Sequence, residues 1–142
     1  MSDVTDRKVF DRLAHVDRML ADVRALDGVR VRCGAWLLRT TLERAVVKLC
    51  SSTLGTGDSR RSMHAMLLSL PKHVDADVAE DTAQLWHALC RAAHHHDYEI
   101  APTVDELHGW HADTKRLCGS LVAARPDLLP LPRVEAVARR HG

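Results

Sequence analysis

The residues in this sequence that are best suited to chemistry lie in one stretch, residues 86–106, at the end of an apolar helical pattern. The side chains there that can titrate or bind a phosphate are Arg91, His87, His94, His95, His96 and Tyr98. An imidazole exchanges a proton near neutral pH, and a guanidinium holds a phosphate through several hydrogen bonds. An arginine beside a histidine is therefore sufficient to cleave RNA without a metal. The imidazole moves a proton to or from the 2′-hydroxyl or the leaving oxygen, and the arginine stabilises the charge on the phosphate.

The helical pattern places most of these side chains on one polar stripe. On a wheel of about 100° per residue, Arg91 lies nearly opposite the apolar face of the helix. His87, His94 and His95 fall within about 60° of Arg91 on that wheel. His96 would point towards the core side if the helix continued, but the helix is expected to end there, before an extended connector.

Two other interpretations of this corner stay open. In the first, His96 packs under the connector and Arg91 caps the last carbonyl groups of the helix, since a helix C-terminus favours positive charge. In the second, the histidines bind a metal. No two histidines on this helix stand four positions apart, and a metal site would need His108 or His111 from the next helix. We therefore expect neither a metal nor another cofactor.

Apolar residues at alternating spacings of three and four predict an all-helical chain. The expected helices run from about Thr5 to Asp27, from Arg30 to Cys50, from Ser59 to Leu70, from Asp77 to about His96, and from Thr103 to Ala124. Residues 51–58 have the composition of a loop. Pro71 is expected to end the third helix, because the residue before a proline avoids the helical region.

The last two long helices have recognisable starts. Asp77 and Thr103 are each followed three positions later by a glutamate, which is the pattern of an N-cap with an acidic residue in the first turn. The connector between these two helices is short, so the last helix is expected to return antiparallel to the one before it. That arrangement would bring His108 and His111 towards the histidine run.

Together these elements predict an all-α fold, an antiparallel bundle of four main helices plus short helices. Residues 1–125 are expected to form a single helical-bundle domain, followed by a C-terminal tail, residues 126–142, with room for one short helix. The residues predicted to share one core are Val78, Leu85, Leu89, Leu107, Leu117 and Leu121.

Composition excludes several classes of protein. The formal net charge is +1, so the chain as a whole has no basic field that would indicate nucleic acid binding. The second helix is the most basic element, and its cations are expected to form a solvated face: Arg30, Arg32, Arg39, Arg44 and Lys48. No stretch approaches the roughly 20 apolar residues that span a bilayer, and the start of the chain has no secretory pattern. The four cysteines stand far apart, so a cytoplasmic protein with reduced thiols is expected.

The spacing Arg91-x-x-x-x-His96, at a helix end in a small helical domain, resembles the HEPN family (higher eukaryotes and prokaryotes nucleotide-binding), whose signature is R-x(4–6)-H. The wider run, L-C-R-A-A-H-H-H-D-Y-E-I-A-P-T-V-D-E-L, is similar to a segment of small actinobacterial proteins of this class. The close resemblance covers about 20 residues, and the remainder of the chain resembles the family only as helical architecture.

The resemblance implies a HEPN-like homodimer in which two motifs meet across the interface and form a composite RNA-cleaving site. Such a protein would be a metal-independent endoribonuclease of a toxin–antitoxin or defence system, with an antitoxin protein as partner. Arg91 and His96 would be catalytic, with the remaining histidines of the stretch and Tyr98 in supporting positions. The alternative is a catalytically inactive helical dimerisation or interaction module. Ala92 stands where active members of the family usually carry a polar residue, which favours that alternative.

Overall fold

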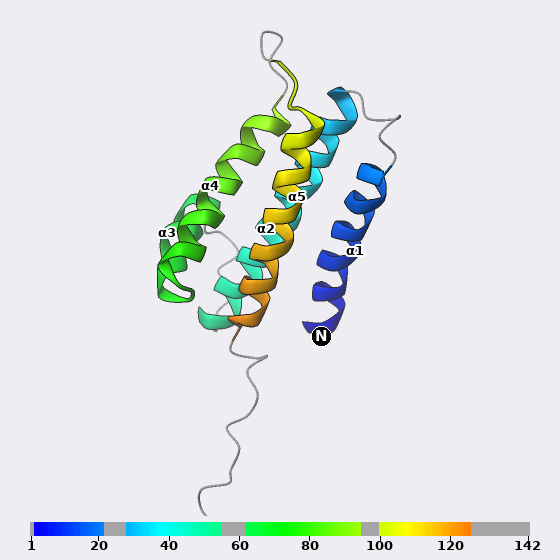
Figure 1. The fold of residues 1–142 in the computed structure, drawn as a ribbon. Coiled ribbons are helices and arrows are strands. Elements are labelled where there is room, and N and C mark those ends of the chain that lie inside the picture. The colour runs from blue at the N-terminus through cyan, green and yellow to red at the C-terminus, as the bar shows by residue number, and fades with distance from the viewer. Residues whose placement is uncertain (1, 22–27, 55–61, 95–99, 126–142) are drawn as a thin grey trace, which may run out of the picture.

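The computed structural model describes residues 2–21, 28–54, 62–94 and 100–125 (Figure 1). Its five α-helices and one short 3₁₀ helix are α1 (Ser2–Ala21), α2 (Gly28–Leu54), α3 (Met63–Ser69), η2 (Leu70–Lys72), α4 (Ala76–Ala93) and α5 (Val104–Ala123). No strand occurs within these ranges, so the all-α prediction is confirmed for them. None of the helices in the described ranges is both long enough and apolar enough to cross a bilayer.

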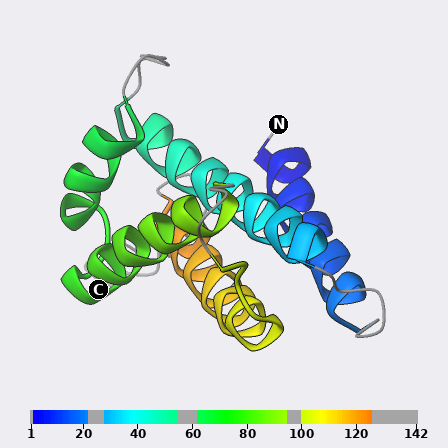
Figure 2. The same cartoon turned by 90° about the horizontal axis from the view of Figure 1, so that it is seen from above.

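The fold is organised around α2, which packs against α1, α3, α4 and α5. Seen from above, α1 and α4 lie on opposite sides of it (Figure 2). This central position follows from the sequence of α2, because its buried residues recur every three or four positions along most of its length. They include Val31, Ala35, Leu38, Leu42, Val46 and Leu49.

The other long helices each bury one apolar stripe against this centre. In α1 the apolar residues at alternating spacings of four and three are Val9, Leu13, Val16 and Leu20, and all four are buried. Five of the six residues predicted for a shared core are buried, and the sixth, Val78, is half-buried and packs against the same core. α4 and α5 therefore meet α2 through the faces that their periodicity predicts.

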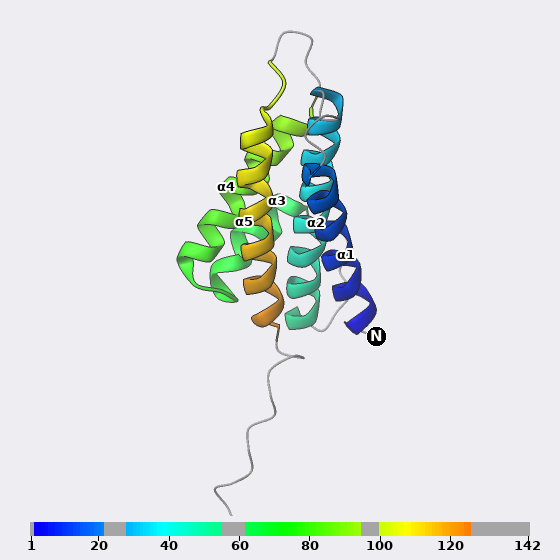
Figure 3. The same ribbon diagram turned by 45° about the vertical axis from the view of Figure 1, so that its right-hand side comes forward.

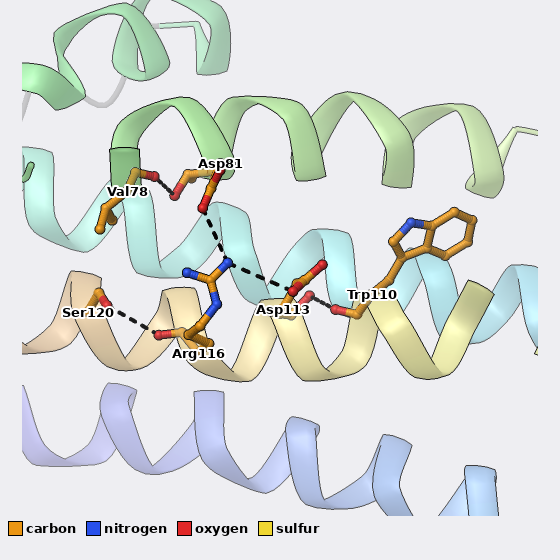
Figure 4. Close-up of polar contacts among 8 residues, drawn as sticks. Val78, Asp81, Trp110, Asp113, Arg116 and Ser120 are labelled. Carbon is orange, nitrogen blue, oxygen red and sulfur yellow. Dashed lines mark hydrogen bonds and ion pairs between the residues drawn. The ribbon is translucent and has the colours of Figure 1, made fainter. Parts of the chain in front are cut away.

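The capping box at the start of α5 is confirmed. The Thr103 hydroxyl accepts a hydrogen bond from the backbone N–H of Glu106 at 3.1 Å, and the Glu106 carboxylate accepts one from the Thr103 N–H at 2.8 Å. Further along, Arg116 reaches across to Asp81 of α4 at 3.3 Å and lies 3.8 Å from Asp113 of its own helix (Figure 4). These exposed ion pairs contribute little to stability, and only the pair with Asp81 joins α4 to α5.

Several helix boundaries differ from prediction. α1 begins at Ser2 rather than near Thr5, and its expected end near Asp27 lies outside the described residues. α2 continues to Leu54, so the loop predicted from residue 51 is wrong for residues 51–54. Ser and Thr favour caps and turns only by modest free energies, which a helix that is already packed easily overrides. α3 begins at Met63 rather than near Ser59.

The prediction that Pro71 ends the third helix is confirmed, because α3 ends at Ser69 and Leu70 is its C-cap residue. Pro71 lies inside η2, where the first turn needs no donated N–H from it and its fixed φ suits the helix. α4 begins at Ala76 with Asp75 as N-cap residue, and Asp77 instead lies in the first turn, where its negative charge suits the helix dipole.

Candidate functional site

Arg91 lies in the last turn of α4 with its side chain exposed. Among the residues that the structure describes, its guanidinium has no hydrogen-bond or ion-pair partner. The capping of the α4 carbonyl groups, which one interpretation of the sequence gave to Arg91, is performed by Arg32 of α2. Its guanidinium donates to the His94 carbonyl oxygen at 2.6 Å and lies 3.5 Å from that of Ala92. Because Arg32 satisfies the helix end, Arg91 is left available for another ligand.

Both arginines line a groove of about 360 Å³ at one end of the molecule. The start of α2, the end of α4 and the start of α5 all lie at this end (Figures 1 and 3). The remaining lining residues are Ala88, Ala92, Ile100, Ala101, Pro102, Thr103, Glu106 and Trp110. The one carboxylate among them, that of Glu106, already accepts the two hydrogen bonds from Thr103. The groove therefore combines two cations with apolar walls, which suits an anionic ligand.

The structure places the candidate histidines unevenly. His87 is exposed one turn before Arg91, and its ring packs edge-on against Trp86 with the ring centroids 5.0 Å apart. His94 is the C-cap residue of α4 in extended conformation, and its side chain is exposed. The helix thus ends at Ala93, three residues before the predicted end at His96. His95, His96 and Tyr98 lie outside the described residues, so the distance from Arg91 to His96 is not part of the structure.

The expectation that His111 turns towards the histidine run is wrong. His111 is buried and faces α1, where its Nε2 lies 3.3 Å from the Leu13 carbonyl oxygen and 3.2 Å from an Asp17 carboxylate oxygen. The spacing explains this position, because His111 comes four residues after the buried Leu107 and three before the buried Thr114.

The site offers neither a metal cluster nor an activated thiol in its described part. Within residues 2–21, 28–54, 62–94 and 100–125, no group of three or more His, Cys, Asp or Glu side chains is gathered to hold a metal ion. Cys90 is adjacent to Arg91 in the chain, but burial raises the pKa of its thiol, an effect that the nearby Arg39 partly offsets. A thiol with a raised pKa is a poor nucleophile at neutral pH.

Arg32 is the residue of this site that sequence reasoning missed. It lies about 60 positions before the residues that it contacts, and the only signal was its membership of the basic second helix, which was expected to be a solvated face. No protein-family model matches the chain, and no curated protein and no solved structure matches it either. A function for this protein is therefore proposed from the chemistry of the groove alone.

Proposed function

We propose that this protein is a HEPN-like, metal-independent endoribonuclease of a toxin–antitoxin or defence system, acting through Arg91 and His96. Arg91 holds the scissile phosphate and stabilises the charge that builds on it. His96 is the general acid–base, taking the proton of the attacking 2′-hydroxyl and returning one to the leaving 5′-oxygen. The product of this step carries a 2′,3′-cyclic phosphate.

The observation that carries the proposal is the exposed guanidinium of Arg91 on the wall of the groove, which has no partner among the described residues. A structural arginine at a helix end normally bonds to the carbonyl groups there, but in this protein Arg32 does so from another helix. A cation that has no structural partner and faces an open groove is available to bind an anion. Arg32 lines the same groove and adds a second positive charge.

The course of the chain supports the involvement of His96. Residues 95–99 connect His94, whose carbonyl oxygen binds Arg32, to Ile100, which lines the groove. The connection therefore begins and ends beside the site. Since His96 is two residues from His94, covalent geometry keeps the two Cα atoms within about 7 Å. His96 therefore belongs to a segment whose two described ends lie beside the groove.

The proposal includes the finer architecture, a HEPN-type antiparallel bundle of α1, α2, α4 and α5, and a homodimer with a composite site. The outer face of α4 and α5 is suited to a second copy, because it carries charges of both signs. Asp81, Asp113 and Arg116 lie along a cavity of about 260 Å³ on this face, which shares Ala88 and Trp110 with the groove of Arg91. A symmetric contact here would bring the two Arg91 side chains near each other.

RNA cleavage in the presence of EDTA tests the proposal. Wild-type protein is expected to cleave RNA to products with a 2′,3′-cyclic phosphate and to arrest growth when expressed. Arg91→Ala and His96→Ala should each lower the cleavage rate by about 10²–10⁴-fold. Arg18→Ala on α1 and His64→Ala on α3 are matched controls, because both side chains are exposed and neither lines the groove.

Two results would contradict the proposed ribonuclease activity. One is cleavage that persists in Arg91→Ala and His96→Ala at the rate of the controls. The other is a strict monomer in light scattering at micromolar concentration, which would leave one motif per particle and remove the composite site.

A second candidate function is a catalytically inactive interaction module. Ala92, directly after Arg91, is buried, so this position gives the groove no additional polar group. Under this alternative, wild-type protein cleaves no RNA and arrests no growth, but it binds a protein partner through the corner around Arg91. Loss of that binding in Arg91→Ala, with unchanged folding, would support the module.

A further inference from the structure

The outer face of α2 carries a second feature that the proposed activity does not use. Val29, Cys33, Trp36, Thr40 and Val47 follow one another at spacings of four, three, four and seven, so they share one side of the helix. The large apolar side chains among them are far from buried: Val29 is 70% exposed, Trp36 49% and Val47 41%. In the described part of the chain, the core lies on the other side of α2 and leaves this stripe to solvent.

Two cavities lie along this stripe and share Trp36. The first has a volume of about 410 Å³ and is lined by Val29, Arg32, Cys33, Trp36 and Ala93. The second has a volume of about 570 Å³ and continues past Trp36 to Val47. We call the two together the α2 groove. From Val29 to Val47 it is about 27 Å long at 1.5 Å per residue, which matches roughly five turns of a second helix.

The second cavity has a strongly positive rim. Arg12 of α1 and Arg44 and Lys48 of α2 line it. The pKa of Arg12 is lowered, first by burial and then by repulsion from Arg44, which lines the same cavity. Neither these two residues nor Lys48 has an ion-pair partner among the described residues. Such a concentration of unpaired cations is unfavourable until an anion lies between them.

Glu43, the one acidic residue lining this cavity, does not neutralise the cluster. Its carboxylate accepts a hydrogen bond from the Trp86 indole N–H at 2.9 Å and pairs with Arg39 at 3.6 Å. Both contacts involve the same oxygen, Oε1, so Glu43 is already engaged by Trp86 and Arg39. The α2 groove therefore presents apolar side chains along its floor and uncompensated positive charge on its rim.

We propose that the α2 groove binds an amphipathic helix of a partner protein, with apolar residues on one face and Asp or Glu residues beside them. The apolar face fills the two cavities on either side of Trp36, and the acidic side chains pair with Arg12, Arg44 and Lys48. This mode of recognition uses anchor residues at helical spacing. The surface lies on the opposite side of Arg32 from the groove of Arg91, so it does not depend on RNA cleavage.

Charge and shape decide against two other occupants. A second copy of the chain in a symmetric contact would set this basic face against itself, and like charges across an interface are costly. Single-stranded nucleic acid would satisfy the cations, but it binds through a series of aromatic platforms. Trp36 is the one aromatic residue lining the two cavities, and the stripe from Val29 to Trp36 is apolar.

Three labelled 21-residue helical peptides test the proposal by fluorescence anisotropy. All three carry the same leucine and isoleucine face, and their flanking positions hold glutamate, glutamine or lysine. Binding is expected in the order glutamate, glutamine, lysine, with at least about a tenfold difference in Kd between the first and the last. The affinity for the glutamate peptide should fall as salt is raised.

Variants of the groove give the sharper result. Trp36→Ala should weaken binding of the glutamate peptide by about tenfold or more, as for a central aromatic anchor. Arg44→Glu should weaken it to a similar extent. Leu68→Ala on α3 and Lys115→Glu on α5 are the matched controls, because they change an exposed apolar and an exposed basic residue outside the groove.

Equal affinity for the three peptides would overturn the proposal. The absence of binding by all three peptides at about 100 µM would also overturn it, because a specific helical peptide is expected to bind with a Kd below that concentration. A twelve-nucleotide single-stranded RNA that binds through Trp36 more tightly than the glutamate peptide would assign the groove to nucleic acid instead. Dimerisation lost specifically in Trp36→Ala would assign it to a second copy.

Discussion

Replacing Gly34 by alanine tests the closest approach of α2 and α5. A Cβ atom at this position would lie 2.9 Å from Cδ2 of Leu107 and 3.2 Å from its Cδ1. Leu107 is completely buried, so its methyl groups have no solvent to move into. Overpacking of this kind costs about 1–3 kcal/mol, whereas alanine in a helix interior gains about 0.5–1 kcal/mol over glycine. Gly34→Ala is therefore expected to lower the free energy of unfolding by about 1 kcal/mol.

Gly109→Ala is the matched control for this prediction. Gly109 is exposed on α5, and a Cβ atom there would meet no atom within 4 Å. This substitution gains the helix propensity without the clash, so it should raise the free energy of unfolding by about 0.5–1 kcal/mol. Urea denaturation followed by circular dichroism measures both. If Gly34→Ala were as stable as Gly109→Ala, α2 and α5 would not pack at Leu107 as described.

Three further predictions concern the core, the helix end and pH. Leu89→Ala should lower the free energy of unfolding by about 2–5 kcal/mol, because the side chain is fully buried, and a thermal melt within a degree of wild type would contradict its placement. Arg32→Ala should cost about 1–2 kcal/mol in urea denaturation, since the α4 carbonyl groups lose a charged donor, and Arg32→Lys should recover only part of it. Burial raises the pKa of Cys118 to about 12 from an ordinary value near 9. The unfolded thiol then loses its proton first, so stability falls as pH rises from about 9 to about 12. By pH 11 wild type should lose about 2–3 kcal/mol more than Cys118→Ala, and parallel pH profiles would refute this.

The sequence predicts best those parts of the fold where one local pattern decides the outcome. The start of α5 is such a part, because Thr103 and Glu106 satisfy each other's backbone groups without help from the rest of the chain. The buried stripe of α1 is another, since a polar helix with one apolar face has only one way to pack. In both cases local preference and tertiary packing agree.

Prediction failed where tertiary packing overrides a weak local preference. Ser and Thr after Cys50 suggested a loop, but the helix continues to Leu54. His111 was judged by its chemistry rather than by its position, although its spacing from Leu107 already placed it on the buried face.

The candidate site shows the same division between local and distant information. Arg91 could be found because its neighbours in the chain give it a polar stripe and an exposed position. Arg32 could not, because its function at the end of α4 is defined by carbonyl groups about 60 residues away. No pattern within α2 distinguishes this arginine from the other cations of the same helix.

Arg32 also explains why the two proposals can be tested separately. Its side chain lines both the groove of Arg91 and the first cavity of the α2 groove, so it forms the wall between them. Arg91 lines only its own groove, and Trp36 lines only the two cavities of the α2 groove. If the functions are distinct, Arg91→Ala should abolish RNA cleavage and leave peptide binding intact, and Trp36→Ala should do the reverse. Arg32→Ala should weaken both, because it removes a positive charge from each surface and loosens the helix end that separates them.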